Sequence, residues 1–449
     1  MKLVISGGRI ISPGDNIDYV GSILVEDGLI KKISKKPIPL RDALLIRPGK
    51  KGPRALKKSD RIVIDAHGLI ITPGLIDIHV HFREPGREDA ETIKTGMMAA
   101  AAGGFTSVIT MPNTFPANDN QSTTLFILQQ AARSGLVHIF PAGAITRDRK
   151  GESLAEIGEM AEAGIVAVTD DGNCVSNSMM MRHALEYASD FKVRVLSHSE
   201  DTTLSAGGVM HEGFVSTRLG LPPIPPQAET SMVYRDISLS ALTGVPVHIM
   251  HVSTKESVEL IRQAKKAGIK VTAETTPHHL ALTDEAVEKS DYDTSTKVNP
   301  PLRTQDDVDA LIEGLLDGTI DAIATDHAPH TTTDKEQDYI AAPFGIIGLE
   351  SAIPVCLDRL VATKRVPLAL LIQKLTTGPA DAIGLKKGRL LRGSDADITI
   401  IDTAKKVTID PAKFYSKGRN CPFAGWSLQG APVCTITSGQ IRMIDGRVV

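Results

Sequence analysis

The sequence lacks the cysteine pattern of a secreted protein or of a thiolate metal site. It has four cysteines in 449 residues, and no two of them form a CxxC pair. This scatter excludes a disulfide framework and a zinc site built on paired thiolates. Scattered free cysteines are typical of a reducing compartment, so we expect a cytoplasmic protein.

The sequence also lacks an excess of charge of either sign and any long hydrophobic run. Lysine and arginine total 50 and aspartate and glutamate 53, which gives a net charge of -3. Such a balance does not predict a surface for nucleic acid or for an anionic membrane. No apolar run reaches the length of a membrane span, and the opening MKLVISGGRI has no signal-peptide core. We therefore expect a small-molecule partner, no nucleic acid and no membrane.

Short strand-like runs are concentrated at the two ends of the sequence. KLVISGGRII and GSILVEDGLIKKI lie within residues 1–72, and DADITIID and APVCTITSGQIRMIDGRVV lie within residues 385–449. Unpaired strands would expose their edges, so we expect both ends to pair into one small β domain. A basic, Pro/Gly-rich segment, residues 35–61, is interpreted as an exposed loop.

Residues 73–384 repeat one pattern, in which a helical run ends at a glycine and an apolar strand follows. The glycines are Gly104, Gly135, Gly164, Gly244, Gly268 and Gly318. They supply left-handed helix caps, and Ser253 with Glu256 is expected to form a capping box. With strands at 74–81 and 191–198, eight strands alternate with helices, which predicts an α/β fold, a TIM (β/α)8 barrel. The alternative is a doubly wound open sheet, but no GxGxxG loop follows the first strand.

Metal-ligand residue types end the predicted strands, where a TIM barrel has its active site. His79 and His81 are two residues apart on a strand, so their imidazoles share one face. The other strand ends carry Asp170-Asp171, His198, His251, Glu274 and Asp326. One histidine at a strand end is more often a core residue, but this convergence predicts a metal centre. Nitrogen and oxygen ligands without thiolate favour zinc, with manganese or cobalt as alternatives.

The remaining histidines, apart from His330, are interpreted as structural or solvated. His248 and His327 are out of phase with His251 and Asp326, so they should face away from the metal. His278 and His279 are expected to pack beside the site rather than to bind the ion.

Nine motifs, in order, resemble the dihydroorotase family in its bacterial type I branch. They are PGLIDIHVHFREPG from Pro73, MPNT from Met111, TDDG from Thr169, HSE from His198, HVS from His251, ETTPHHL from Glu274, KVNPPLR from Lys297, ATDHAPH from Ala324 and PFGIIGLE from Pro343. The resemblance covers the whole middle of the chain, and only the basic segment 35–61 departs from it. It implies a hydrolase that interconverts dihydroorotate and N-carbamoyl-L-aspartate in pyrimidine biosynthesis.

The resemblance also implies residue roles. His79, His81 and Asp326 would bind one metal, His198 and His251 a second, and Asp171 would bridge them, with one or two Zn²⁺ per subunit left open. Arg83, Asn113 and His330 would hold the substrate carboxylate, Asn299 and the backbone of Phe344 and Gly345 would hold the ring, and His81 would also lie against the substrate. Asp171 is preferred to Asp170 because its 27-residue separation from His198 matches the family. Asp326, beside the attacking water, would carry the proton to the departing nitrogen.

Two other functions compete with this interpretation. An allantoinase or hydantoinase typically uses a carboxylated lysine where this chain has TDDG, and the strand GIVAVTDDG contains no lysine. A non-catalytic scaffold subunit would have lost ligands, and none is missing. The polar segment 330–344 is either a plain loop or a lid. The sequence leaves open whether the chain forms a homo-oligomer or associates with aspartate transcarbamoylase.

Overall fold

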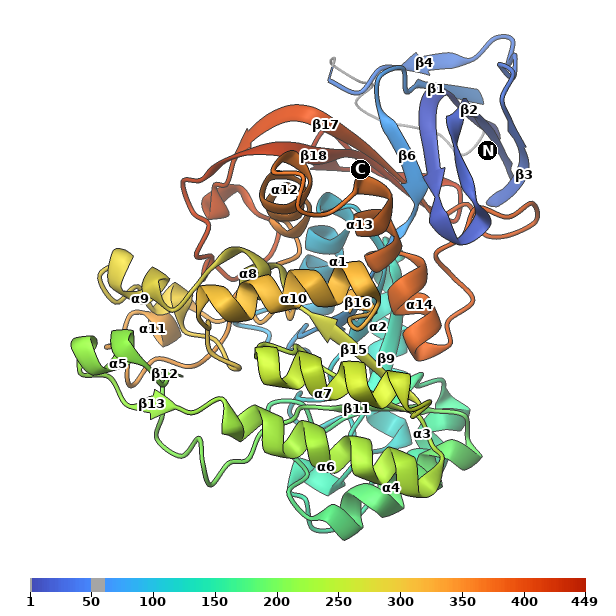
Figure 1. Cartoon of the computed structure of the whole chain (residues 1–449). Helices are drawn as coiled ribbons and strands as arrows, with labels where there is room; N and C mark the ends of the chain where they lie inside the picture. The colour runs from blue at the N-terminus through green and yellow to red at the C-terminus, as the bar shows by residue number, and fades with distance from the viewer. Residues whose placement is uncertain (1, 50–60) are drawn as a thin grey trace.

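A computed structural model describes residues 2–49 and 61–449 as a barrel with a second β sheet beside it (Figure 1). The barrel sheet has eight strands in chain order, and every neighbouring pair is parallel. Its strands are β7 (Leu75–Val80), β8 (Phe105–Thr110), β9 (His138–Gly143), β10 (Ala167–Val168), β11 (Arg194–Ser197), β14 (Val247–Ile249), β15 (Val271–Thr275) and β16 (Ala322–Ile323). A parallel bridge between Val80 and His327 brings the last strand beside the first. The TIM-barrel prediction is confirmed.

The barrel strands read as apolar runs because both of their faces are covered. All six residues of β7 and all six of β8 are buried. Strands of a parallel sheet are enclosed by helices on one face and by packed side chains on the other, so alternation with polar residues is lost. The polar residues therefore collect at the strand ends.

Helices surround the barrel sheet. They are α1 (Ile93–Ala102), α2 (Gln121–Ser134), α3 (Ile157–Ala163), α4 (Ser178–Asp190), α6 (Gln227–Thr243), α7 (Lys255–Lys266), α10 (Gln305–Asp317), α12 (Ala352–Cys356), α13 (Leu368–Lys374) and α14 (Thr377–Ile383). Shorter elements in the loops are α5 (Phe214–Leu219), α8 (Pro277–Ala281), α9 (Glu285–Lys289), α11 (Thr332–Lys335) and the strand pair β12 (Met210–His211) and β13 (Pro223–Ile224). On α7 the buried side chains Val258, Ile261 and Ala264 recur every three residues, which gives the helix one apolar face.

The predicted capping box at the start of α7 is wrong by one residue. The N-cap is Thr254, whose side chain accepts a hydrogen bond from the backbone N–H of Ser257. Ser253 is not the cap, because its hydroxyl donates to the Glu229 carboxylate and accepts from Nε of Arg303 (3.0 Å).

The second sheet joins strands from both ends of the sequence, as predicted. Its strands are β1 (Lys2–Ser12), β2 (Ile17–Glu26), β3 (Leu29–Ser34), β4 (Leu44–Ile46), β5 (Arg61–Asp65), β6 (Ile70–Pro73), β17 (Ile398–Thr408), β18 (Ser427–Thr437), β19 (Gln440–Ile444) and β20 (Arg447–Val448). β6 is the joint, since it pairs with β1 on one side and with β17 on the other (Figure 1). The sheet has its own core, in which Ile5, Ile71 and Ile400 are fully buried.

The interpretation of residues 35–61 as an exposed loop is wrong for part of that segment. β4 pairs in parallel with β5, and Ile46 is buried in the core of the small sheet. Three consecutive apolar residues, LLI, provide the strand inside an otherwise basic stretch. Residues 50–60 of the segment lie outside the described residues. The limits 1–72, 73–384 and 385–449 stay a prediction.

Among the helices of the described ranges, none is both long enough and apolar enough to cross a membrane.

Candidate active site

Six predicted metal ligands come together at the carboxyl ends of the barrel strands. His79 lies near the end of β7 and His81 directly follows it, while His198 directly follows β11. Asp171, His251 and Asp326 follow β10, β14 and β16 within three residues. All six are buried. The chain thus places side chains from residues 79 to 326 around one point.

Asp171 lies between the two pairs of histidines. Its Oδ1 is 3.4 Å from Nε2 of His79, 3.4 Å from Nδ1 of His198 and 3.6 Å from Nε2 of His251. Its Oδ2 is 3.3 Å from Nε2 of His81. Burial opposes the charge on this carboxylate, but the surrounding imidazoles, His79 above all, hold its pKa well below the usual range. A carboxylate so placed can share its oxygens between two cations.

Asp170 points the other way. Its Oδ1 accepts from the backbone N–H groups of Ile145 (2.8 Å) and Thr146 (3.0 Å), and the Thr146 hydroxyl donates to its Oδ2. Three donors occupy this carboxylate, so it fixes the loop after β9. Adjacent residues on extended backbone face opposite sides, and here that rule separates a ligand-type carboxylate from a structural one.

Asp326 completes the group around the histidines of β7. Its Oδ1 is 3.0 Å from Nε2 of His81 and 3.4 Å from Nε2 of His79. Burial disfavours its ionised form, but the two histidines keep its pKa well below the usual range. It also lines the cavity described below, so it is both at the cluster and open to a ligand.

Neighbouring side chains set the direction of the β7 imidazoles. Nδ1 of His79 lies 2.9 Å from Glu274, whose other oxygen lies 3.1 Å from Nε2 of His248. Nδ1 of His81 lies 2.8 Å from Oδ1 of Asn113. When these acceptors hold the Nδ1 protons, both Nε2 lone pairs point at the cluster. His248 does face away from the cluster as predicted, but it holds the glutamate that orients His79.

The donor set fits a divalent cation. Nε2 of His79 is buried and makes no hydrogen bond, although two carboxylates lie 3.4 Å away. Nδ1 of His198 and Nε2 of His251 face each other at 2.8 Å. Groups of one carboxylate and two histidines, with ligand atoms within 4.8 Å of one another, are the pattern of a zinc-type site. A cation would satisfy these converging nitrogens.

Three residues of the site adopt the left-handed backbone region. The φ angles are +59° at Arg83, +35° at His251 and +48° at Asp326. Non-glycine residues in such conformations cost of order 1–3 kcal/mol each and concentrate at functional sites. The surrounding barrel therefore holds these three side chains in directions that relaxed backbone would not give.

A cavity of about 340 Å³ opens above the cluster. Its lining includes the predicted substrate residues His81, Arg83, Asn113, Asn299, His330, Phe344 and Gly345, together with Asp171, His198, His251 and Asp326. Arg83 donates through Nε to the carbonyl of Pro329 (3.1 Å), and burial lowers its pKa to about 10, so it stays charged at neutral pH. Nε2 of His330 is 2.8 Å from the carbonyl of Phe344, and burial lowers the pKa of His330 to about 3.

The wall formed by Pro343, Phe344 and Gly345 is tied down from outside. The Lys335 ammonium donates to the carbonyls of Pro343 (2.8 Å) and Gly345 (3.2 Å), and burial lowers its pKa to about 7. Asn420, which is 3% exposed, donates to the Gly345 carbonyl at 3.0 Å. A Cβ at Gly345 would come within 2.9 Å of Nε2 of His330, so only glycine lets this wall approach so closely.

Two residues of the site were not singled out from the sequence. Glu200 lies 3.0 Å from both Nε2 of His198 and Nδ2 of Asn299. The sequence does contain a signal for Glu200, because this residue follows His198 by two residues, as His81 follows His79. Asn420 comes from the connection between β17 and β18, and nothing in the sequence places it beside residues 328–345.

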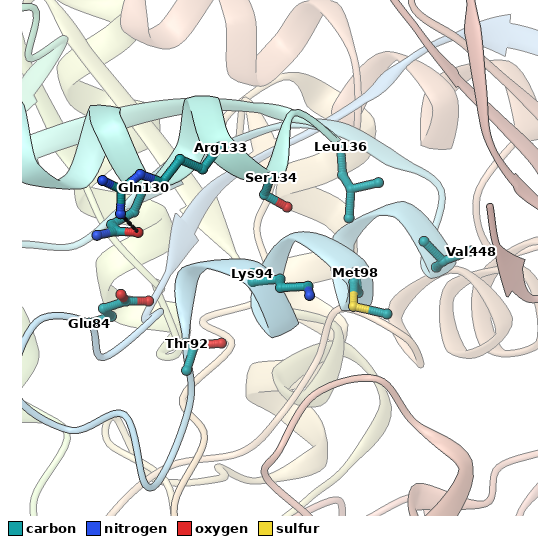
Figure 2. A pocket seen from close by; sticks show the side chains of 9 residues that line it. All are labelled: Glu84, Thr92, Lys94, Met98, Gln130, Arg133, Ser134, Leu136 and Val448. Atoms are coloured by element: carbon teal, nitrogen blue, oxygen red, sulfur yellow. Dashed lines mark hydrogen bonds between the residues drawn. The ribbon is translucent and has the colours of Figure 1, made fainter.

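A larger cavity, of about 670 Å³, lies between α1 and α2 near the carboxyl terminus (Figure 2). Among the described residues that line it, Glu84 is the one carboxylate, and no histidine or cysteine is present. Lys94 and Arg133 supply positive charge at its edge. Without a ligand set for a metal, this cavity does not compete with the first as the catalytic site.

The chain is similar to known proteins over its full length. Residues 68–257 match the dihydro-orotase-like family and residues 259–443 the amidohydrolase family. A dihydroorotase of Geobacter metallireducens is 50% identical over 441 residues, which are 98% of this chain and 99% of that protein. One of Pelotomaculum thermopropionicum is 51% identical over 445 residues, 99% of each chain.

Solved structures agree on the architecture. The L-hydantoinase (dihydropyrimidinase) of Arthrobacter aurescens superposes with a TM-score of 0.83 at 26% identity, over 100% of this chain and 97% of that one. The dihydropyrimidinase of Brevibacillus agri gives 0.83 at 23% identity, over 100% and 96%, and so shares the fold.

Proposed function

Because this chain belongs to the dihydroorotase family, we propose that its buried histidine–aspartate cluster is the catalytic centre of a dihydroorotase. The chain is a hydrolase of a cyclic amide, and it interconverts dihydroorotate and N-carbamoyl-L-aspartate. One observation carries the assignment to this site: a single cavity holds the metal-ligand cluster and a charged arginine, Arg83. The substrate likewise has an amide to be cleaved and a carboxylate to be held.

The metal is proposed to be zinc, with two ions per chain. His79, His81 and Asp326 would hold one, His198 and His251 the other, and Asp171 would bridge them. When bound, such ions supply a nucleophilic water at neutral pH and polarise the substrate carbonyl. The nitrogen and oxygen donors without thiolate suit zinc, with manganese or cobalt as alternatives.

Asp326 is proposed as the residue that moves the proton. It is ionised at neutral pH and faces the cavity, so one of its oxygens can accept a proton from the attacking water. In hydrolysis the ring carbon–nitrogen bond breaks, a carbon–oxygen bond forms, and the proton passes from Asp326 to the departing nitrogen. In the reverse direction the same carboxylate takes the proton from the attacking nitrogen and returns it to the departing water.

The substrate is proposed to lie with its carboxylate toward Arg83, Asn113 and His330. The guanidinium fork of Arg83 matches a carboxylate, and Asn113 keeps its Nδ2 donors because Oδ1 faces His81. Nε2 of His330 lies against the Phe344 carbonyl, so to donate to the carboxylate the ring would have to release that carbonyl or take up a second proton on Nδ1. His81 would also lie against the substrate. Asn299 and the Phe344–Gly345 backbone would hold the ring.

The competing functions are less well supported. A hydantoinase-type centre would need a carboxylated lysine between the metals, and the residues around the described cluster supply Asp171 instead. A scaffold subunit would lack ligands, yet all six predicted ones converge.

Location and assembly belong to the same proposal. We propose a cytoplasmic enzyme that associates into a homo-oligomer or with aspartate transcarbamoylase. The segment 330–344 is proposed to border the cavity, either as a plain loop or as a lid. Light scattering of the chain alone, and after mixing with the transcarbamoylase, tests the association.

The test of the proposed function is metal reconstitution of the purified protein. Apo-protein loaded with zinc is expected to bind two equivalents and to hydrolyse dihydroorotate, with the same activity whether or not bicarbonate is added. Hydantoin and allantoin serve as comparison substrates and should be turned over far more slowly. Faster hydrolysis of either, or reactivation that depends on bicarbonate, would contradict the proposal.

A further inference from the structure

Glu200 makes two contacts through one oxygen. Its Oε2 lies 3.0 Å from Nε2 of His198 and 3.0 Å from Nδ2 of Asn299. The side chain is 15% exposed, and it comes from the segment directly after β11. One carboxylate oxygen therefore joins a proposed metal ligand to a proposed ring contact.

The first contact decides which nitrogen of His198 can bind a metal. A neutral imidazole carries one proton, and a carboxylate accepts but does not donate. Because Nε2 faces Glu200, the proton belongs there, and the lone pair is on Nδ1. Nδ1 is the atom that faces the cluster, 3.4 Å from Asp171 and 2.8 Å from Nε2 of His251. Residues that orient a ligand in this way typically change metal affinity about 10- to 100-fold.

The second contact decides what Asn299 offers to a ligand. An amide side chain has a donor end and an acceptor end, and a carboxylate can bond only to the donor end. Since Nδ2 of Asn299 faces Glu200, its remaining polar atom, Oδ1, is the acceptor. Asn299 lines the cavity, so it presents an acceptor suited to an N–H group of the substrate ring.

We propose that Glu200 is a positioning residue that couples the second metal to recognition of the ring. It holds His198 in the tautomer that binds the metal, and it holds Asn299 with its carbonyl available to a ring N–H. The proposal rests on the proposed function. It adds that the ring subsite presents a hydrogen-bond acceptor, and that Glu200, which is not a metal ligand, positions it. Substrates with an N–H at this position are favoured over analogues methylated at that nitrogen.

Zinc titration of apo-protein tests the first contact without any assay of activity. Glu200→Met removes the acceptor at similar size, and it is expected to leave the first zinc equivalent unchanged and to weaken the second about 10- to 100-fold. Glu200→Gln can keep an acceptor oxygen in the same place, so its second equivalent should bind within about threefold of the parent's. Glu186→Gln, in an exposed ion pair on α4, is the matched control and should bind zinc as the parent does.

A double-substitution cycle at saturating zinc tests the second contact. Glu200→Met and Asn299→Ala should each raise the KM for dihydroorotate about tenfold, while the double variant should be no worse than Asn299→Ala alone. Additive effects would show that Glu200 does not act through Asn299.

Two results would overturn the inference outright. One is second-site zinc affinity in Glu200→Met equal to the parent's. The other is a loss in Glu200→Gln as large as in Glu200→Met, which would make the charge rather than the acceptor decisive. Glu200→Gln keeps the side-chain shape, so a large loss of second-site zinc affinity in this variant would overturn the inference even if Glu200→Met does not fold. Inactivity of the parent toward dihydroorotate would defeat the proposed function but leave the zinc titration interpretable.

Discussion

Asp170 and Asp171 are neighbours whose carboxylates have opposite surroundings. Asp171→Ala is expected to lose the second metal and most activity, because its oxygens lie beside four imidazoles. Asp170→Ala should keep both metals but lower the melting temperature, since it leaves the buried N–H groups of Ile145 and Thr146 without an acceptor, at about 1–3 kcal/mol each. Metal content and thermal unfolding of the two variants separate these outcomes. If Asp170→Ala lost the metal and Asp171→Ala kept it, the bridge would be assigned to the wrong residue.

The proposed contact between Arg83 and the substrate carboxylate can be tested by substitution. Arg83→Ala is expected to raise the KM for dihydroorotate about 10- to 100-fold, because a charge-assisted hydrogen bond contributes about 1.5–3 kcal/mol. Hydrolysis of a dihydropyrimidine ring without the carboxylate should change little. Steady-state kinetics on both substrates make the comparison. Equal damage to both would mean that Arg83 serves the backbone near Pro329 rather than the substrate.

The side chains that converge at the cluster could be predicted residue by residue, but the residues that support them could not. His79 and His81 reveal themselves by spacing on a strand whose end must be at the barrel mouth. Glu200 has the same spacing from His198, yet a single glutamate after a strand resembles any solvated turn residue. The roles of these residues stay predictions, because the geometry brings them together without showing what they bind.

The connection between β17 and β18 reaches from the small sheet to the cavity wall. Asn420 on this connection donates to the carbonyls of Ala328 (2.9 Å) and Gly345 (3.0 Å) and accepts from the backbone N–H of His330 (3.3 Å). One side chain thus holds two segments that carry proposed substrate contacts.

Loss of this side chain should loosen the wall. Asn420→Ala is expected to raise the KM for dihydroorotate several-fold and to lower stability by about 1–3 kcal/mol, because buried polar groups lose their partner. Kinetics and thermal unfolding measure the two effects. Gln263→Ala is the control, since that exposed amide on α7 donates to Glu259. An unchanged KM together with a lowered melting temperature would restrict Asn420 to a structural role.

The helix–strand units that repeat along the barrel could be predicted from the sequence, whereas β4 and the cap of α7, which follow no repeat, could not. Six strands could be counted because each follows a helix that ends at a glycine, and two further apolar runs complete the eight. β4 was missed because three apolar residues are too few to stand out from a basic segment. Thr254 was missed as the cap because the contacts that occupy the Ser253 hydroxyl, with Glu229 and Arg303, are tertiary.

Glu350, in the segment between β16 and α12, links stability to pH where it contacts the connection between β17 and β18. Glu350 accepts from the backbone N–H of Ser416 at 3.1 Å, and burial raises its pKa to about 8. The folded protein therefore binds a proton that the unfolded chain, with a pKa near about 4.3, releases earlier. Between these values the unfolded chain binds fewer protons, so stability falls as pH rises.

Glu350→Gln mimics the protonated side chain and should remove this decline. The melting temperature of the variant relative to the parent is expected to increase from pH 5 to pH 8 by a few degrees, because each pH unit between the two pKa values contributes about 1.4 kcal/mol. In a chain of 449 residues about 1 kcal/mol moves the melting temperature by about 1 °C. Thermal unfolding at several pH values measures the difference. A constant difference across that range would show that Glu350 is ionised throughout.

The place of β6 in the small sheet has a consequence for synthesis of the chain. β6 ends at Pro73, but its partner β17 begins at Ile398. A ribosome adds about 5–20 residues per second, so roughly 320 residues separate the two strands by about 16–64 s. During that interval one edge of β6 is an unpaired template for other chains. Slower translation of the barrel region would lengthen this exposure, so the yield of folded protein depends on the speed of translation as well as on the stability of the finished fold.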